Sequence, residues 1–311
     1  MREYFIWLAK IITIVFVFVF AVPLFIGMAV GASQAFKGGK EVANNHRVGV
    51  VELAGEIVDS KDVVKDLEEF AADDGIDGIV LKIDSPGGAV GPSEEIYSAV
   101  LNAKMKKPVI ASFGGIAASG GYYAAAGCNK IISQPSTLTG SIGVIMQIPN
   151  FRKVAALVGV DMVTIKSGKM KDVGNLFRDM TDDERKYLEH TANTVHENFI
   201  KAVATGRSME RAKLLELADG RIFVGSEALA LGLVDSLGDV HLAARTVFEV
   251  LGKPLPNVGE RGSSPALIYP DDSLRDVKKI FGRIQSSITG ILTLTGVLNQ
   301  SQQTQLKFLA P

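Results

Sequence analysis

Residues 78–88 read Gly-Ile-Val-Leu-Lys-Ile-Asp-Ser-Pro-Gly-Gly, an apolar run that passes directly into a glycine-rich turn. The run has the length and the branched aliphatic residues of a buried strand. A second run, Pro108–Phe113, also leads into a glycine-rich turn, and residues at helical spacing over Ser93–Ala103 lie between the two runs. Two strands separated by a helix predict a parallel sheet with a crossover helix.

The same alternation continues on both sides of this unit. A predicted strand and a predicted helix precede it, Val48–Leu53 and Asp62–Ala72. After it, Thr181-Asp182-Asp183-Glu184 has the capping-box pattern that begins a long helix, which we expect to reach about Gly206. Apolar, β-rich runs predict further strands at Lys130–Ser133, Ile142–Gln147 and Asp161–Ile165. We therefore predict one α/β domain over residues 46–252.

The chain begins with a long apolar segment. No charged residue occurs between Lys10 and Lys37, and residues 11–32 are almost wholly apolar. About 22 residues at about 1.5 Å each give roughly 33 Å, enough to cross a hydrocarbon core of about 30 Å. A cleaved signal peptide is the alternative, but its apolar region is typically only about 7 to 15 residues long. We expect a tail and a transmembrane anchor over residues 1–37, then a polar linker over residues 38–45.

Residues 253–311 differ in character from the predicted domain. Prolines, glycines and serines make the first part an irregular connector. Residues 276–298 then place apolar side chains at helical spacing, which predicts an amphipathic helix. Such a helix packs on its own domain, on a neighbouring subunit or on a membrane surface. The sequence leaves the role of this C-terminal extension open.

Composition narrows the partners and cofactors. The formal net charge is −1 at pH 7, so the chain lacks the basic field that nucleic-acid binding needs, and we expect no nucleic-acid partner. Cys128 is the only cysteine, and its setting in Ala-Ala-Gly-Cys-Asn predicts a buried structural thiol. The four histidines occur at no metal-binding spacing, so we expect neither a metal nor a cofactor.

Both glycine-rich turns follow predicted parallel strands, so they lie at the carboxyl edge of the sheet, where ligands bind. The second turn places Ser119 between small residues, in Ala117-Ala118-Ser119-Gly120-Gly121. Glycines let backbone N–H groups approach an oxyanion, and the N–H that follows a helix-opening serine points toward developing negative charge. Ser119 is therefore the candidate nucleophile. The alternative is that both segments are only tight turns between a strand and a helix.

A nucleophilic serine needs a base. The histidines lack a catalytic pattern, and the sequence has neither a Gly-x-Ser-x-Gly elbow nor a Ser-x-x-Lys motif. Three lysines, Lys166, Lys169 and Lys171, cluster after a predicted strand. A lysine serves as a base only if its surroundings lower its pKa from about 10.4 toward neutrality. From the residues alone, a surface lysine cluster is the default interpretation.

Four segments together resemble the signatures of bacterial signal peptide peptidase A in its short, single-repeat form. They occur in that family's order between about residues 46 and 250: Asp84-Ser85-Pro86-Gly87-Gly88, Ala117-Ala118-Ser119-Gly120-Gly121-Tyr122-Tyr123, Thr139-Gly140-Ser141-Ile142-Gly143-Val144 and Ser167-Gly168-Lys169-Met170-Lys171-Asp172. The resemblance implies a crotonase/Clp-protease-like ββα superhelix, preceded by one N-terminal transmembrane helix. It also implies a homo-oligomeric ring in which the serine and the lysine of one site come from neighbouring subunits.

The resemblance also implies roles for single residues. Ser119 attacks the scissile carbonyl, and Lys171 accepts the proton of the serine. Ser141 hydrogen-bonds the lysine amine and orients it, while the N–H groups of Gly88 and Gly120 form the oxyanion hole. The last position of the family's Ser-Gly-x-x-Lys pattern selects Lys171 over the two other lysines of its cluster.

The function that the resemblance implies is that of a membrane-bound serine endopeptidase. Such an enzyme degrades remnant signal peptides after their release from secretory precursors. Its anchor, residues 11–32, holds it in the cytoplasmic membrane with the catalytic domain on the extracytoplasmic, periplasmic side. Hydrophobic peptides are the expected substrates, at a site lined by Ile116, Ile142, Val144 and Met146. The alternatives are a related membrane peptidase acting on other membrane protein segments, a crotonase-like acyl-CoA enzyme and a non-catalytic scaffold.

Overall fold

The structure is a computed structural model that describes residues 46–253, 255, 259–260 and 263–270. Three expectations lie outside the described residues: the anchor at 11–32, the linker at 38–45 and the amphipathic helix at 276–298. Within the described part of the chain, no helix combines the length and the apolar character that crossing a membrane requires.

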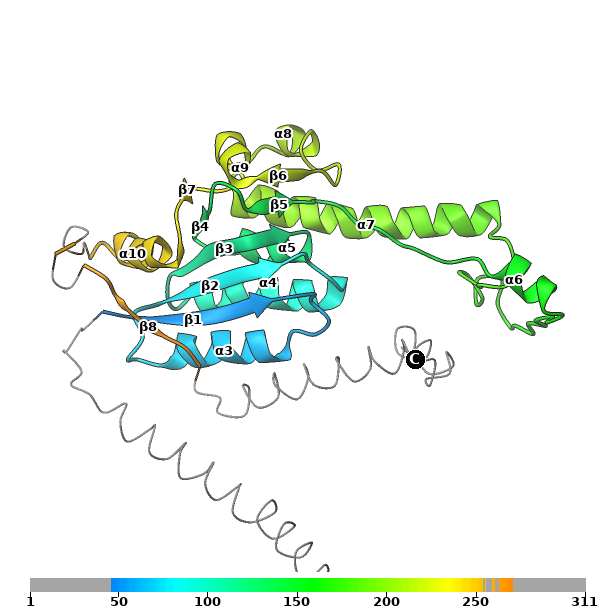
Figure 1. Cartoon of the computed structure of the whole chain (residues 1–311), viewed down its shortest axis with the longest axis horizontal. Coiled ribbons are helices and arrows are strands. Elements are labelled where there is room, and N and C mark those ends of the chain that lie inside the picture. The colour runs from blue at the N-terminus through cyan, green and yellow to red at the C-terminus, as the bar shows by residue number, and fades with distance from the viewer. Residues whose placement is uncertain (1–45, 254, 256–258, 261–262, 271–311) are drawn as a thin grey trace, which may run out of the picture. The chain divides into compact units, whose positions relative to one another are not determined.

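Three parallel strands form the centre of the domain (Figure 1). They are β1 (Arg47–Ala54), β2 (Gly78–Ser85) and β3 (Val109–Ala118). All three are parallel, with Val50 opposite Val80 and Val80 opposite Ile110. This register confirms the parallel sheet that the two glycine-ended runs predicted, and it brings the ends of β2 and β3 to the same edge.

Shorter strands extend this sheet, which has eight strands in the described residues and the main order β6-β5-β3-β2-β1-β8. β3 pairs with β4 through its first half and with β5 through its last three residues, and β4 also pairs with β7. The added strands are β4 (Lys130–Ser133), β5 (Leu138–Gly140), β6 (Ile222–Val224), β7 (Ser236–Leu237) and β8 (Ala266–Ile268). β3 can serve two partners because it runs past the predicted end of its apolar run.

Helices cover both faces of the sheet (Figure 1). Leu81 and Ile83 on β2 belong to a core cluster that also contains Leu67 and Ile96, from the two helices that follow β1 and β2. Val80, on the opposite face, belongs to a second cluster with residues of α10. The helices are α3 (Lys61–Ala72), α4 (Val90–Lys104), α5 (Gly120–Ala126), α8 (Arg211–Leu215), α9 (Gly225–Leu231) and α10 (Val240–Val250). Both faces of the sheet are buried, which explains why the central strands are apolar rather than alternating.

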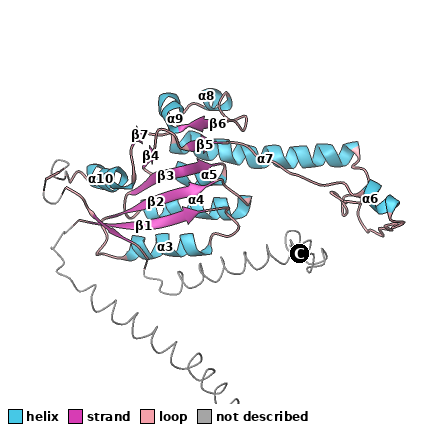
Figure 2. Ribbon diagram, viewed as in Figure 1, coloured by secondary structure: helices cyan, strands magenta, loops and turns pink. Residues whose placement is uncertain are grey.

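A long helix carries an arm away from this domain (Figure 2). The helix α7 (Asp182–Gly206) packs its last part on α5, where Phe199, Ile200 and Val203 are buried. The first part of α7 projects from the domain together with the short helix α6 (Arg152–Leu157) and the loops around it, and we call this projecting part the arm. The predicted capping box is confirmed: the Thr181 hydroxyl accepts from the Glu184 N–H, and the Glu184 carboxylate accepts from the Thr181 N–H.

Two predicted strands, Ile142–Gln147 and Asp161–Ile165, are wrong. Both segments lie in or next to the arm, and neither forms a strand. Most of their apolar side chains are exposed, such as Ile145 at 82% and Ile165 at 96%, although Ile142 is fully buried. An apolar run forms a strand only where a neighbouring strand is available to pair with it, and no strand of the described residues pairs with these segments.

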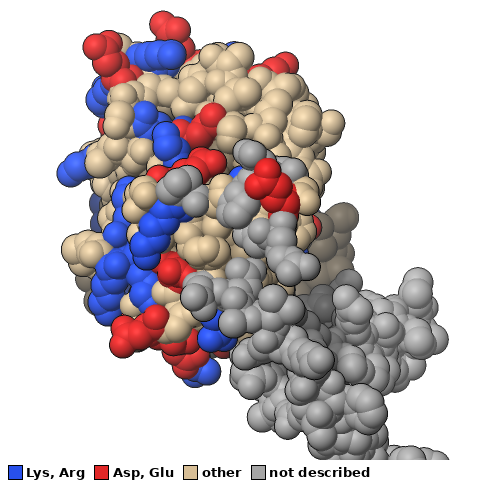
Figure 3. All heavy atoms as spheres, turned by 90° about the vertical axis from the view of Figure 1, so that its left-hand side faces the viewer, with Lys and Arg blue, Asp and Glu red and all other residues tan. Residues whose placement is uncertain are grey.

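Charged side chains are mixed on the domain surface. On the face drawn in Figure 3, acidic and basic residues lie side by side rather than in separate fields. Several form ion pairs, such as Lys82 with Glu52 and Lys130 with Asp235. The predicted buried state of Cys128 is confirmed, and burial raises the pKa of its thiol to about 12.

Candidate active site

The two glycine-rich turns touch each other at the carboxyl edge of the sheet. A Cβ atom added to Gly87, in the turn after β2, would lie 2.8 Å from the Ser119 Cβ and 2.7 Å from the Gly120 nitrogen, in the turn after β3. Gly87 also has φ +96°, a conformation that side-chain-bearing residues rarely adopt. Its N–H donates to the Ser85 hydroxyl, which donates to the Gly55 carbonyl, and these bonds fix the first turn. Only glycine permits this contact between the turns.

Ser119 stands in a strained position between β3 and α5. Its φ is 51° and its ψ is −121°, outside the regions that a serine normally occupies. Such backbone strain costs about 1–3 kcal/mol and is found mainly at functional sites. Two hydrogen bonds hold it: the Ser119 N–H donates to the Gly140 carbonyl at 2.9 Å, and the Ser119 carbonyl accepts from the Tyr123 N–H at 2.8 Å. The surrounding structure therefore fixes the direction of the serine side chain.

Ser141 occupies an equivalent position on the neighbouring strand. Ala118 and Gly140 are opposite each other in the pairing of β3 with β5, so Ser119 and Ser141 are the next residues of two adjacent strands. Ser141 also has a φ of 51°, and its N–H donates to the Arg221 carbonyl. The structure brings the two serines to one edge of the sheet.

The backbone around Gly88 and Gly120 faces the same space. The Cβ position of Gly120 lies 3.4 Å from the Gly88 nitrogen, so the two glycines are adjacent. Gly120 is the first residue of α5, and the N–H groups of a first helical turn have no acceptor within the helix. Two neighbouring N–H groups beside a serine are the components of an oxyanion hole.

A small cavity opens on these residues. Ser119, Gly88 and Gly120 line it together with side chains from α4, α5 and α7. The other lining residues are Val90, Ser93, Glu94, Tyr123, Gly143, Val144, Val195 and Phe199. Burial, with a further contribution from the Glu94 carboxylate, raises the pKa of Tyr123 to about 12, so the phenol is neutral at physiological pH. The lining is apolar on the side of α7.

The predicted apolar lining is confirmed for one residue of four. Val144 borders the cavity. Ile142 is fully buried in the core, Ile116 is absent from the lining, and Met146 lies on the arm, where it borders a different hollow. No sequence pattern indicated Val195 and Phe199, because their contribution depends on where α7 crosses the domain.

Lys171 lies far from Ser119 of the same chain. It is exposed, in the loop between α6 and α7, and its neighbour Lys169 pairs with Asp183 at the start of α7. Phe199 at the cavity is about 17 residues further along α7, which corresponds to about 25 Å of helix. Within one chain, therefore, Ser119, Ser141, Gly88 and Gly120 come together and the lysine does not.

The three lysines of the cluster differ in their partners. Lys166 forms an ion pair with Asp172, and Lys169 forms one with Asp183 at 2.7 Å. The hydrogen bond that the Lys169 amine donates to the Asp183 carboxylate raises the pKa of Lys169, away from the range of a general base. The Lys171 amine forms neither a hydrogen bond nor an ion pair with any described residue. Of the three, Lys171 is the lysine whose amine is available to another molecule.

The histidines lie elsewhere. His196, on α7, contacts the backbone after Ser141: its Nε2 lies 3.2 Å from the carbonyl oxygen of Ile142. No histidine lines the Ser119 cavity. Among the described residues, no group of three histidine, cysteine or acidic side chains is arranged to hold a metal ion.

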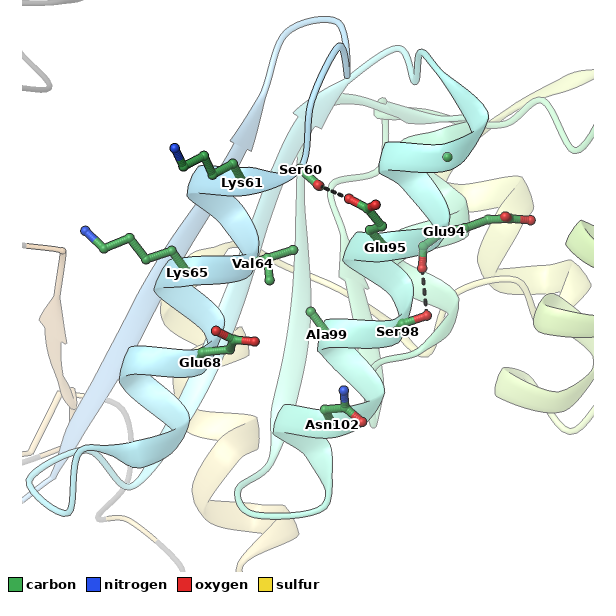
Figure 4. A pocket seen from close by; sticks show the side chains of 11 residues that line it. Ser60, Lys61, Val64, Lys65, Glu68, Glu94, Glu95, Ser98, Ala99 and Asn102 are labelled. Atoms are coloured by element: carbon green, nitrogen blue, oxygen red, sulfur yellow. Dashed lines mark hydrogen bonds between the residues drawn. The ribbon is translucent and has the colours of Figure 1, made fainter. Parts of the chain in front are cut away.

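A wider groove lies between α3 and α4, away from the serine (Figure 4). Its volume is about 860 Å³, and both acidic and basic side chains line it. The Ser60 hydroxyl donates to Glu95, and the Ser98 hydroxyl donates to the Glu94 carbonyl, so both hydroxyls serve the helices themselves. Both serine hydroxyls in this groove are therefore occupied, one by the Glu95 carboxylate of the neighbouring helix and one by a backbone carbonyl of its own helix.

Comparison with known proteins first defines the class of the fold. The family model for Clp protease matches residues 42–139, which include β1, β2, β3 and Ser119. This match agrees with the mixed α/β sheet and with the serine at the start of a helix. The fold is therefore Clp-protease-like, as the sequence motifs implied.

A second family model and a similar protein identify the family. The model for peptidase family S49 matches residues 102–251, which include Ser119, Ser141 and Lys171. A protein of Enterococcus faecium, named provisionally as signal peptide peptidase SppA, is 33% identical over 232 residues, which are 67% of this chain and 67% of that protein. The chain belongs to peptidase family S49, the family of signal peptide peptidase A.

Two further relatives show how much of other family members the chain matches. A Synechocystis protein, named provisionally as a protease, is 44% identical over 160 residues, 51% of this chain. The chloroplastic serine protease SPPA of Arabidopsis thaliana is 33% identical over 228 residues, 73% of this chain. The matched regions span 58% of the first protein and 33% of the second.

Proposed function

We propose that the protein is a serine endopeptidase whose active site is completed by two copies of the chain. The observation that carries the proposal is the position of Ser119. It is held at positive φ beside the adjacent backbone of Gly88 and Gly120, in a cavity with an apolar wall. Membership of peptidase family S49 supports the same activity.

The residues around the serine are suited to the hydrolysis of a peptide bond. The Ser119 hydroxyl attacks the scissile carbonyl carbon, and the carbonyl oxygen becomes an oxyanion. The N–H groups of Gly88 and Gly120 stabilise that oxyanion, an effect usually worth about 10²- to 10³-fold in rate for each donor. The serine gives its proton to the base, which then protonates the leaving amine as the C–N bond breaks. Water, deprotonated by the same base, then attacks the acyl-serine ester, which releases the carboxylic acid and returns the proton to the Ser119 oxygen.

We propose Lys171 of a neighbouring copy as that base. Three features support it. The amine is unpaired among the described residues, and about 25 Å of helix separates the start of α7, where the lysine loop ends, from Phe199 at the cavity. Exposed apolar side chains on the arm also favour contact with another protein surface. In the proposed site, Ser141 accepts or donates a hydrogen bond at the lysine amine and orients it. The cavity of the neighbour would withdraw the amine from water.

The proposed substrates are hydrophobic peptides, and remnant signal peptides in particular. The apolar wall formed by Val144, Val195 and Phe199 supports this substrate class. An anchor at residues 11–32 would hold the enzyme in the cytoplasmic membrane, where released signal peptides remain, with the catalytic domain on the periplasmic side. A ring of copies would hold each Lys171 against the next Ser119.

Mixing two inactive variants tests the shared site. The full chain, solubilised in detergent, is incubated with a synthetic signal peptide. Ser119→Ala and Lys171→Ala are each expected to lose cleavage. Co-assembled in equal amounts, they restore about one quarter of the wild-type rate, because about one site in four then joins an intact serine to an intact lysine across a repeated interface. A mixture as inactive as either variant would contradict the shared site, and cleavage by Ser119→Ala alone would contradict the serine mechanism.

A further inference from the structure

Arg178 connects the turn that carries Lys171 to the start of α7. Its Nε lies 3.0 Å from a carboxylate oxygen of Asp172, the residue that follows Lys171, and its Nη2 donates to the Asp172 carbonyl at 3.1 Å. The same guanidinium donates to the Glu184 carboxylate at 2.8 Å and makes a second, shorter bond to it. One side chain thus holds the lysine turn and the first turn of α7 together.

The two carboxylates are withdrawn from solvent although the arm is exposed. The Asp172 side chain is 11% exposed and the Glu184 side chain is 4% exposed. Hydrogen bonds from Arg178 are the main reason that the pKa of each carboxyl falls to about 2, with Lys166 contributing at Asp172. Both carboxylates are therefore ionised at neutral pH and bound to the same cation.

The other contacts of the lysine turn are the ion pairs of Lys166 with Asp172 and of Lys169 with Asp183, and hydrogen bonds within the segment. Three short turns carry it, closed by the bonds Lys171 N–H to Gly168 carbonyl, Val173 N–H to Met170 carbonyl and Asn175 N–H to Asp172 carbonyl. The residues before it, 161–169, are all exposed, so an apolar core does not hold the segment. Arg178 adds an ionic connection with planar, two-sided geometry that a lysine amine lacks, because a guanidinium binds carboxylates with fixed direction.

We infer that Arg178 is the positioning residue for Lys171. The inference rests on the proposed function, in which the lysine enters the site of a neighbouring copy. Glu184 belongs to α7, and the buried Phe199 and Val203 fix that helix in the domain. A chain of contacts runs from the core through α7, Glu184 and Arg178 to Asp172. It fixes the position of the backbone at Lys171. Arg178 touches neither serine nor substrate and acts only through the lysine.

The inference predicts a change in turnover rather than in substrate binding. A misplacement of about 1 Å in a catalytic group lowers the rate by about 10²-fold. In the full chain, Arg178→Gln is therefore expected to lower kcat on a synthetic signal peptide by about 10²-fold, with KM changed less than about threefold. Arg178→Lys restores the charge but not the two-sided geometry, so it stays at least about tenfold below wild type.

Arg152 offers a matched control on the same arm. It forms an ion pair with Asp179 in which both side chains are well exposed, 60% and 66%. Exposed pairs contribute little, so Arg152→Gln, which removes the same charge, is expected to keep kcat within about twofold of wild type. Equal losses in Arg152→Gln and Arg178→Gln would overturn the inference, because the effect would then follow net charge on the arm. A kcat for Arg178→Gln within threefold of wild type would overturn it as well.

Co-assembly separates positioning of the lysine from general damage to the fold. In one mixture, Arg178→Gln is added to the Ser119→Ala copies, which supply the lysine; in the other it is added to the Lys171→Ala copies, which supply the serine. Activity is expected to fall at least about tenfold in the first mixture and to stay unchanged in the second. Equal activity in the two mixtures overturns the positioning role of Arg178 and leaves the shared site standing. No activity in the parental mixture of Ser119→Ala with Lys171→Ala overturns the shared site and this inference with it.

Discussion

Replacing Gly87 by alanine tests whether contact between the two glycine-rich turns holds the candidate serine in place. The added methyl group would lie 2.7 Å from the Gly120 nitrogen and 2.8 Å from the Ser119 Cβ, closer than such atoms approach in folded proteins. The left-handed φ costs about 1–2 kcal/mol for alanine, and overpacking adds about 1–3 kcal/mol, so the expected loss in free energy of unfolding is about 2–5 kcal/mol.

Two other glycines separate these contributions. Gly55 has φ +75° but open space around it, so Gly55→Ala is expected to lose only the conformational part, about 1–2 kcal/mol. Gly91 lies in α4 with ordinary backbone angles and no atom near its Cβ position, so Gly91→Ala is expected to be neutral or to stabilise by up to about 1 kcal/mol.

Thermal unfolding of the full chain in detergent, followed by circular dichroism, measures these differences. About 3 kcal/mol corresponds to a fall in Tm of roughly 6–12 °C for a domain of this size. Labelling of Ser119 by a fluorophosphonate reports the site itself and should drop sharply in Gly87→Ala alone. If Gly87→Ala matches Gly55→Ala in both Tm and labelling, the contact between the turns does not position the serine.

Three further results are expected. Leu67→Ala removes a fully buried side chain between α3 and the sheet, so the free energy of unfolding should fall by about 2–5 kcal/mol in urea titrations; a loss below 1 kcal/mol would contradict the described core. Asp172 and Glu184 have pKa values of about 2 in the folded arm against ordinary values of 3.8 and 4.5, so they stabilise the arm above about pH 5 and this contribution is lost as the pH falls toward 2. Pepsin cleavage between residues 160 and 184, corrected for the pH dependence of pepsin itself, should therefore rise between pH 4 and pH 2. A constant cleavage rate would contradict a stabilising role for the contacts of Arg178 with Asp172 and Glu184. Cys128, with a buried thiol of pKa about 12, should resist iodoacetamide at pH 8 until the domain is unfolded in urea, and rapid alkylation of the folded chain would contradict its burial.

The central sheet could be predicted from the sequence because its signals are local. Each of β1, β2 and β3 is a short apolar run that ends in a turn signal, and the helices between them show their own periodicity. The segments Ile142–Gln147 and Asp161–Ile165 carry the same apolar signal without becoming strands. Pairing depends on a neighbour that the sequence of one chain does not specify, so local pattern failed there.

In the candidate site, too, a local sequence pattern predicts some residues and misses others. Ser119, Gly88 and Gly120 lie directly after the strands that position them, and glycine-rich turns indicate such positions in the sequence. Val195 and Phe199 reach the cavity only because α7 folds back over α5, a contact that no local pattern encodes. The proposed pairing of Lys171 with Ser119 came from the family motif. The structure adds that the Lys171 amine is unpaired among the described residues, while Lys169 is bound to Asp183.

The proposed shared site gives a physical reason for the exposed arm. Side chains such as Leu157, Val163 and Ile165 are 86%, 85% and 96% exposed, and each would release roughly 1.5–3 kcal/mol on full burial. A surface of this kind is unfavourable in an isolated chain and favourable once another copy covers it. The same contact that buries these residues would bring Lys171 to a neighbouring serine. Under this proposal, an isolated copy holds a nucleophile without a base, so assembly and activation are one event, and the serine stays inert until the arm is bound.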